Sequence, residues 1–140
     1  VEEHKLWFNP TTGEPAGMDP INIANAYDEM EMMPGVISYW NKALENFDTV
    51  DPGVFSGNLF KVLRAYKSEN RLADAVHYLE KSIEKLPAEY VLPTTYTLAK
   101  FSLVNKVSTK KGKKALKYCR DNYLENRFFT LNDLDELEKM

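Results

Sequence analysis

The sequence has one cysteine, Cys119, and two histidines among its 140 residues. A lone cysteine can form neither an internal disulfide nor a zinc site by itself, so we expect Cys119 to be a core residue. No apolar run approaches the roughly 20 residues that a membrane-spanning helix needs. We therefore expect a soluble or peripheral protein, with no membrane span and with a core that needs no covalent or metal support.

A catalytic constellation is also missing. His4 and His77 have no second histidine, cysteine or carboxylate pair at metal-ligand spacing, and we expect His77 to face solvent. Gly13 and Gly17 lack the adjoining lysine of a phosphate-binding loop. We expect no enzyme activity, no catalytic or metal-binding residue, no cofactor and no small-molecule substrate.

Basic residues are scarce in the first part of the chain. Residues 1–60 hold 10 acids against 2 bases, and residues 61–105 hold 5 acids against 7 bases. Residues 106–120 hold 7 bases and no acid, and residues 121–140 hold 6 acids against 2 bases. An acidic first half followed by one concentrated basic segment favours a charged partner over general affinity for nucleic acid.

The first twenty residues have little capacity for a helix, because proline and glycine recur through them. These residues are Pro10, Gly13, Pro15, Gly17 and Pro20. Residues 1–20 are predicted to be an extended arm, and residues 21–140 a single helical-repeat domain. Trp7 and Phe8 form an aromatic pair in the arm. Two interpretations stay open: the pair folds back onto the domain, or it enters a partner's pocket.

Apolar spacings of three and four residues, with turn residues between them, predict helices and no strand. Asp19 and Pro20 favour a helix start, and Thr109 is a candidate N-cap. Thr130 or Asn132 is a candidate cap for the last helix. The predicted helices span about residues 21–31, 36–47, 54–67, 72–86, 93–104, 109–123 and 130–137.

A short pattern repeats at spacings of 39 and 40 residues around Tyr39, Tyr78 and Tyr118. Each tyrosine follows an apolar residue by two positions, and each is predicted to belong to the second helix of a unit and to help build the stack of helices. Periods of 20 to 50 residues indicate stacked supersecondary units. The predicted fold is all-α, an α-α superhelix of about three helix-turn-helix repeats plus a C-terminal capping helix, with about seven helices.

One stretch resembles known helical repeats. Ser56–Glu89 is 34 residues long and can be aligned with a tetratricopeptide repeat, although Leu63 stands where that family prefers a small residue. The same stretch is similar to a pentatricopeptide repeat, because residues 65–75 resemble that family's turn between helices. Residues at the eight tetratricopeptide signature positions are Leu59, Val62, Leu63, Tyr66, Ala75, Leu79, Ser82 and Pro87.

Pentatricopeptide proteins typically bind single-stranded RNA in organelles, through polar residues on the first helix of each unit. At the matching position this chain has Lys61, where that family uses Asn, Ser or Thr. Residues 40–85 also resemble the subunit Va family of cytochrome c oxidase, which lies on the matrix side of its complex. The expected architecture is similar to the pentatricopeptide-type accessory subunit of mitochondrial ATP synthase. These resemblances imply a mitochondrial, matrix-side location.

The basic segment contains Lys106, Lys110, Lys111, Lys113, Lys114, Lys117 and Arg120. Cations in the first turn of a helix oppose its dipole, at about 0.3–1 kcal/mol for each close position. The segment is compatible with a solvated face, with docking onto an acidic protein, or with RNA or anionic lipid.

The sequence favours a non-catalytic subunit of an oxidative-phosphorylation complex that binds other protein subunits. Lys110, Lys111, Lys113, Lys114, Lys117 and Arg120, together with Lys61, Trp7 and Phe8, are the predicted partner-binding residues. The alternative is an organellar RNA-binding protein in transcript or ribosome function.

Overall fold

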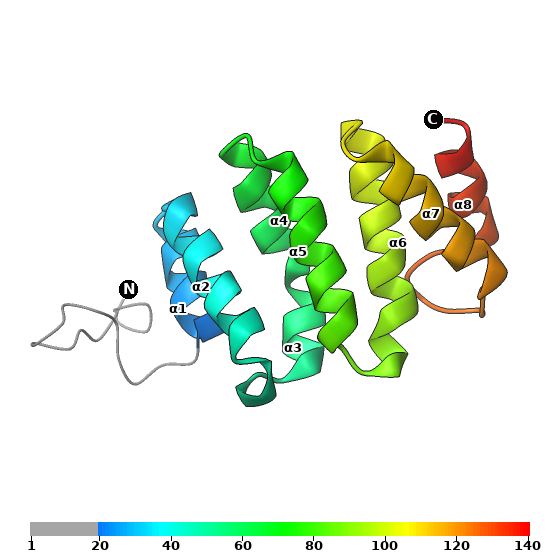
Figure 1. The fold of residues 1–140 in the computed structure, drawn as a ribbon. Helices are drawn as coiled ribbons and strands as arrows, with labels where there is room; N and C mark the ends of the chain where they lie inside the picture. The colour runs from blue at the N-terminus through cyan, green and yellow to red at the C-terminus, as the bar shows by residue number, and fades with distance from the viewer. Residues whose placement is uncertain (1–19) are drawn as a thin grey trace, which may run out of the picture. The chain divides into compact units, whose positions relative to one another are not determined.

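The computed structural model describes residues 20–140, so the expected arm with Trp7 and Phe8 lies outside the described residues, except for Pro20. Residues 20–140 form eight α-helices and a short 3-10 helix and contain no strand (Figure 1). The prediction of an all-α fold is confirmed. The chain divides into two compact units, one up to Arg71 and one from Leu72. The single domain over 21–140 stays a prediction.

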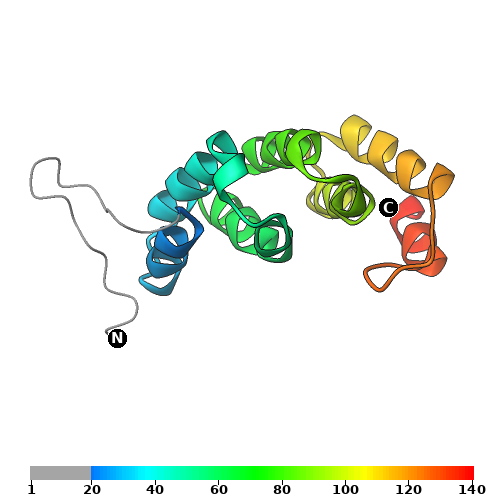
Figure 2. The same ribbon diagram turned by 90° about the horizontal axis from the view of Figure 1, so that it is seen from below.

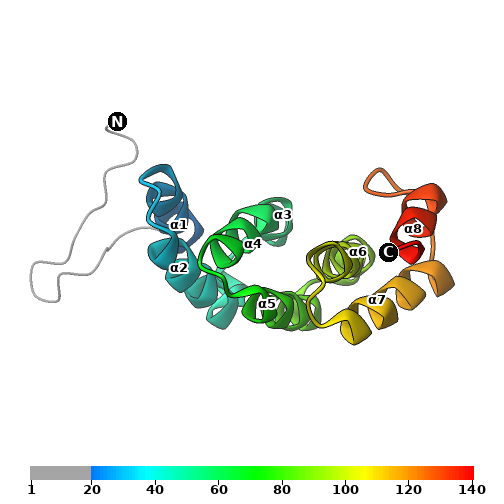
Figure 3. The ribbon, with the colours of Figure 1, turned by 90° about the horizontal axis from the view of Figure 1, so that it is seen from above.

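The first unit is arranged around α2. In Figures 2 and 3, α1 and α4 lie on the same side of α2. Close packing of α1 and α2 depends on Gly35, because a Cβ built there would lie 2.6 Å from the Tyr27 ring. The elements are α1 (Pro20–Glu29), α2 (Met33–Glu45), η2 (Phe47–Thr49), α3 (Pro52–Gly57) and α4 (Leu59–Ser68).

Aromatic side chains fill the core of this unit. Trp40 and Phe55 are fully buried, with ring centroids 5.3 Å apart, and Phe47 meets Phe55 edge-on at 5.1 Å. Asn41 Nδ2 donates to the Tyr66 hydroxyl over 2.9 Å and joins α2 to α4. These contacts hold α2, α3 and α4 together.

The prediction of one helix over 54–67 is wrong. The chain forms α3 and α4, which are separated at Asn58. Asn58 Nδ2 donates to the Val54 carbonyl oxygen over 2.7 Å, and Gly57 precedes it with a low helix propensity. Asp51 caps α3, because its Oδ1 accepts from the N–H groups of Gly53 at 2.8 Å and Val54 at 3.2 Å. The break raises the helix count from the expected seven to eight.

The second unit has two layers, with α5 and α7 in one and α6 and α8 in the other (Figures 2 and 3). Because α6 and α8 both lie on one side of α7, the opposite face of α7 is uncovered within this unit. Its elements are α5 (Leu72–Lys85), α6 (Ala88–Asn105), α7 (Thr109–Asp121) and α8 (Leu131–Glu138).

The helix predicted to begin near Pro93 begins five residues earlier, at Ala88. Pro93 therefore lies inside α6, where its ring removes one backbone donor. Nearby hydroxyl groups bond to the helix backbone: Thr95 Oγ1 donates to the Val91 carbonyl over 2.7 Å, and Thr97 Oγ1 to that of Pro93 over 3.1 Å. Pro93 therefore occupies the second turn of α6, and not the start of the helix as the sequence had indicated.

A tight turn joins α6 to α7. Lys106 and Ser108 both have positive φ angles, 55° and 49°. Ser102 Oγ lies 3.0 Å from the Ser108 carbonyl oxygen and within hydrogen-bond distance of that of Val107, which ties the turn to α6. The predicted cap Thr109 is the first helical residue, and Ser108 holds the N-cap position without a side-chain capping bond.

The link between α7 and α8 is anchored by Phe129. Its buried ring stacks on Tyr96 of α6, with centroids 4.4 Å apart, and meets Tyr123 edge-on at 5.8 Å. Thr130 is the cap of α8, as one predicted alternative had it, and forms a capping box with Asp133. With Leu134 and Leu137 buried, α8 packs on α6 and α7 and closes this unit as expected.

Candidate partner-binding surface

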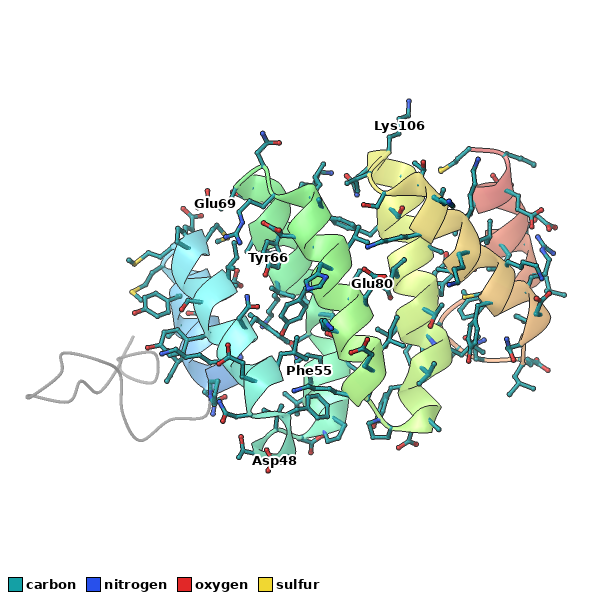
Figure 4. The ribbon with its side chains drawn as sticks, viewed as in Figure 1. Asp48, Phe55, Tyr66, Glu69, Glu80 and Lys106 are labelled. Carbon is teal, nitrogen blue, oxygen red and sulfur yellow. The ribbon has the colours of Figure 1, made fainter. Side chains whose placement is uncertain are left out.

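The basic segment covers the turn before α7 and the exposed surface of α7 itself. Lys106 is in the turn, and Figure 4 shows it pointing away from the helices. The remaining six cations lie along α7, whose other side is buried. The buried residues of α7 are Gly112, Ala115, Leu116 and Cys119. Separation of these two faces follows from the helical period and was visible in the sequence.

Three of the seven cations have acidic partners within the second unit. Lys111 Nζ lies 2.8 Å from Glu80 Oε1 of α5, and Lys117 Nζ lies 2.7 Å from Asp121 Oδ2 one turn further along α7. Arg120 bonds two carboxylates of α8, with Nη2 2.7 Å from Asp135 Oδ1 and Nε 2.7 Å from Glu138 Oε1. These hydrogen bonds raise the pKa of Arg120. The sequence had predicted all three as partner-binding residues, yet their charges are matched inside the unit.

The other four cations have no acidic partner within 4.0 Å anywhere in residues 20–140. They are all exposed. We call Lys106, Lys110, Lys113 and Lys114 the free lysines. They occupy the turn before α7 and the first turns of the helix, so the unmatched positive charge of the basic segment is concentrated at one end of α7.

This end of α7 is where a cation is least favourable for the helix. Lys110 and Lys111 lie in its first turn, which contains no acidic residue. The N-terminal end of a helix dipole is positive, so these ammonium groups are repelled by the helix itself. Glu80 offsets this for Lys111, but no carboxylate of the described chain does so for Lys110.

Tyr118 departs from the repeat pattern. Tyr39 and Tyr78 are buried, whereas Tyr118 is 42% exposed. Lys111 and Tyr118 are two turns apart, so they share the side of α7 that faces α5 at Lys111. Figures 1 and 3 show α5 and α7 separating toward the C-terminal end of α7. The third tyrosine therefore does not pack into the helix stack as the repeat pattern had indicated.

Lys61 lies in the first unit and already has a bonding partner. Its Nζ donates to Asn25 Oδ1 of α1 over 3.0 Å and lies 6.0 Å from the Phe60 ring centroid. The side chain is half-buried. Lys61 therefore links α4 to α1 inside its own unit, and its predicted role in binding a partner stays a prediction.

Cys119 and His77 lie in different surroundings. Cys119 is fully buried, and burial raises the pKa of its thiol to about 11, whereas His77 is exposed as expected. Across residues 20–140, no group of three His, Cys, Asp or Glu could hold a metal ion. None of the helices in this range is long and apolar enough to cross a membrane.

Comparison with known proteins adds no family assignment. No protein-family model, curated protein or solved structure matches the chain. The resemblances to tetratricopeptide and pentatricopeptide repeats, and to subunits of cytochrome c oxidase and ATP synthase, therefore stay predictions from the sequence.

Proposed function

We propose that this chain is a non-catalytic helical subunit that binds an acidic protein surface through the free lysines at the start of α7. The observation that carries the proposal is the contrast within the basic segment. Lys111, Lys117 and Arg120 have carboxylate partners, but four exposed lysines beside them have none in the described chain. Carboxylates of a partner would neutralise these lysines and offset the helix-dipole repulsion at Lys110.

The host assembly that we propose is a mitochondrial oxidative-phosphorylation complex, on its matrix side. Support for this host comes from the sequence resemblances to accessory subunits of ATP synthase and cytochrome c oxidase. Trp7 and Phe8 would supply apolar anchorage in the same interface, while the lysines orient the subunit against acidic residues.

Non-denaturing electrophoresis of the native protein, with and without nuclease, tests this function. We expect the chain to migrate with a respiratory complex or with ATP synthase, and to stay there after nuclease treatment. Migration as a free chain, or release by nuclease, would contradict the proposal; nuclease release would favour the RNA-binding alternative.

Charge-reversed variants test the surface itself. Lys110→Glu with Lys114→Glu should remove the chain from the complex, because two free ammonium groups become carboxylates. Lys67→Glu with Lys100→Glu changes the net charge by the same amount at exposed lysines elsewhere and should have little effect. Equal behaviour of the two double variants would show that net charge, and not the α7 surface, controls binding.

A further inference from the structure

Lys110, Lys114 and Tyr118 form one row along α7. They are spaced by four residues, so each lies about one helical turn from the next, with Cβ atoms about 5–6 Å apart. The whole row spans about 12 Å at a rise of 1.5 Å per residue. Lys113 lies beside the row, and Lys106 lies in the turn before it.

Tyr118 has the properties of an interface anchor. Its side chain is 42% exposed, and its hydroxyl and ring have no hydrogen-bond or stacking partner among residues 20–140. Exposed tyrosines that become buried on binding are common among the residues that dominate protein interfaces. Lys114 is one turn away, so an apolar contact at Tyr118 and an ion pair at Lys114 can be made by neighbouring residues of one partner segment.

The charges around the row limit its length. Beyond Tyr118 lies Asp121, whose Oδ2 accepts a hydrogen bond from Lys117 Nζ over 2.7 Å. Lys111, which shares the side of α7 on which Tyr118 lies, is matched by Glu80. The unmatched positive charge of the basic segment is therefore limited to the four free lysines at one end of the helix.

A row this short fits protein carboxylates better than a nucleic-acid strand. Contact with four phosphates of a single strand gives a salt dependence of only about −3 in log K against log salt, which corresponds to weak binding. A strand continuing past Tyr118 would also approach the Asp121 carboxylate. An acidic protein segment has no such continuous charge and can place an apolar side chain where the lysines end.

We infer that Tyr118 and the free lysines together bind a short acidic segment of a partner protein, in which an apolar residue lies next to two or three carboxylates. The carboxylates pair with Lys110 and Lys114, and the apolar residue packs on the Tyr118 ring. This inference rests on the proposed function and adds the chemistry of the partner.

Three labelled probes test the inference on the full chain by fluorescence anisotropy at low salt. The first is a short peptide of glutamates with leucines beside them, the second has serines in place of the leucines, and the third is an oligouridylate of similar length. We expect the leucine peptide to bind about five- to tenfold more tightly than the serine peptide, because leucine buries apolar surface on Tyr118. Tyr118→Ala should abolish this difference and leave binding of the serine peptide nearly unchanged.

Phe128→Ala is the matched control, since Phe128 is 57% exposed and lies in the link before α8. It should keep the preference for leucine. Equal binding of the two peptides by the wild-type chain, or a preference that survives in Tyr118→Ala, would overturn the role of Tyr118. Tighter binding of the oligouridylate than of both peptides would overturn the partner class.

Failure of the inference can be told apart from failure of the proposed function. Lys110→Glu with Lys114→Glu should lose both peptides. If that double variant binds both peptides as the wild-type chain does, the lysine surface itself is wrong and the proposed function fails with it. If only the leucine preference is missing, the lysine surface stands without its aromatic anchor.

Discussion

Gly112 lets α6 and α7 approach closely because it has no side chain. A Cβ built on Gly112 would overlap the Ser102 side chain, with its Cβ only 2.8 Å away, and would lie 3.2 Å from Leu103 Cγ. Both neighbours belong to α6 and are buried, so neither can move aside freely. The crossing of these helices in turn sets the direction in which the free lysines of α7 point.

We predict that Gly112→Ala lowers the free energy of unfolding by about 1–3 kcal/mol, because the added methyl group overpacks this crossing. Urea denaturation followed by circular dichroism measures the change. Gly57→Ala is the control, since nothing lies within 4 Å of a Cβ at that position and the substitution should be neutral or slightly stabilising. A Gly112→Ala variant as stable as the wild-type chain would show that α6 and α7 can separate without loss.

We predict that the buried Cys119 thiol makes the stability of the chain depend on pH. Burial raises the pKa of its thiol from 9.0 to about 11 in the folded chain, so the unfolded chain loses this proton first. The corresponding stability is fully present below pH 9 and is lost as pH rises toward 11. This rise in the pKa of the thiol corresponds to roughly 2–3 kcal/mol of the free energy of unfolding.

The measurement is urea unfolding at pH 8, 9, 10 and 11, on the wild-type chain and on Cys119→Ala. Lysines and tyrosines titrate in both chains, so the difference between the two pH profiles reports the thiol together with its coupling to Tyr96, whose pKa is raised by burial, by Asp133 and by Cys119. Parallel profiles over the whole range would contradict a buried, protonated Cys119.

At the scale of elements, α7 combines a well-packed buried face with an unfavourable first turn. We predict that Lys110→Gln raises the free energy of unfolding by about 0.3–1 kcal/mol, because it removes a cation from the positive end of the helix dipole. Lys67→Gln is the matched control, since Lys67 lies in the last turn of α4, where a cation is favourable. It should lower stability by a similar amount.

Both changes are read from urea denaturation at low salt, and both should shrink at 1 M salt, where charges are screened within about 3 Å. A destabilised Lys110→Gln chain would mean that Lys110 has a favourable role within the fold. In that case, helix-dipole repulsion could not be a cost that partner binding offsets.

Helix positions were largely predictable from the sequence, and the errors have local causes. Apolar residues at helical spacing located each helix of residues 20–140 to within a few residues, except for the break between α3 and α4 and the starts of α2 and α6, which lie three and five residues before the predicted starts. The break at Asn58 depends on a side-chain bond to the Val54 carbonyl, and competition of this kind leaves little trace in an apolar pattern. The start of α6 was missed because Pro93 was taken as a first-turn residue, although the helix accommodates it in its second turn.

At the scale of the whole molecule, the proposed function depends on electrostatic attraction between exposed groups. We predict that the fraction of the chain bound to its host complex falls steeply between 0.05 and 0.5 M salt, because the screening length drops to less than half over this range. Co-sedimentation with the complex at increasing salt measures it. Binding that is unchanged at 0.5 M salt would indicate an interface dominated by apolar contacts, such as those proposed for Trp7 and Phe8.

The sequence by itself determined the all-α class, the two faces of α7 and the place of the basic segment, because these depend on helical period and on residue order. Only the tertiary structure decided which cations are matched. Lys111 meets Glu80 from 31 residues away, and Arg120 meets Asp135 and Glu138 from 15 and 18 residues away. It also decided that Tyr118 is exposed while Tyr39 and Tyr78 are buried. The distance between groups far apart in the chain is set by how helices pack, and a pattern local to one helix carries no information about it.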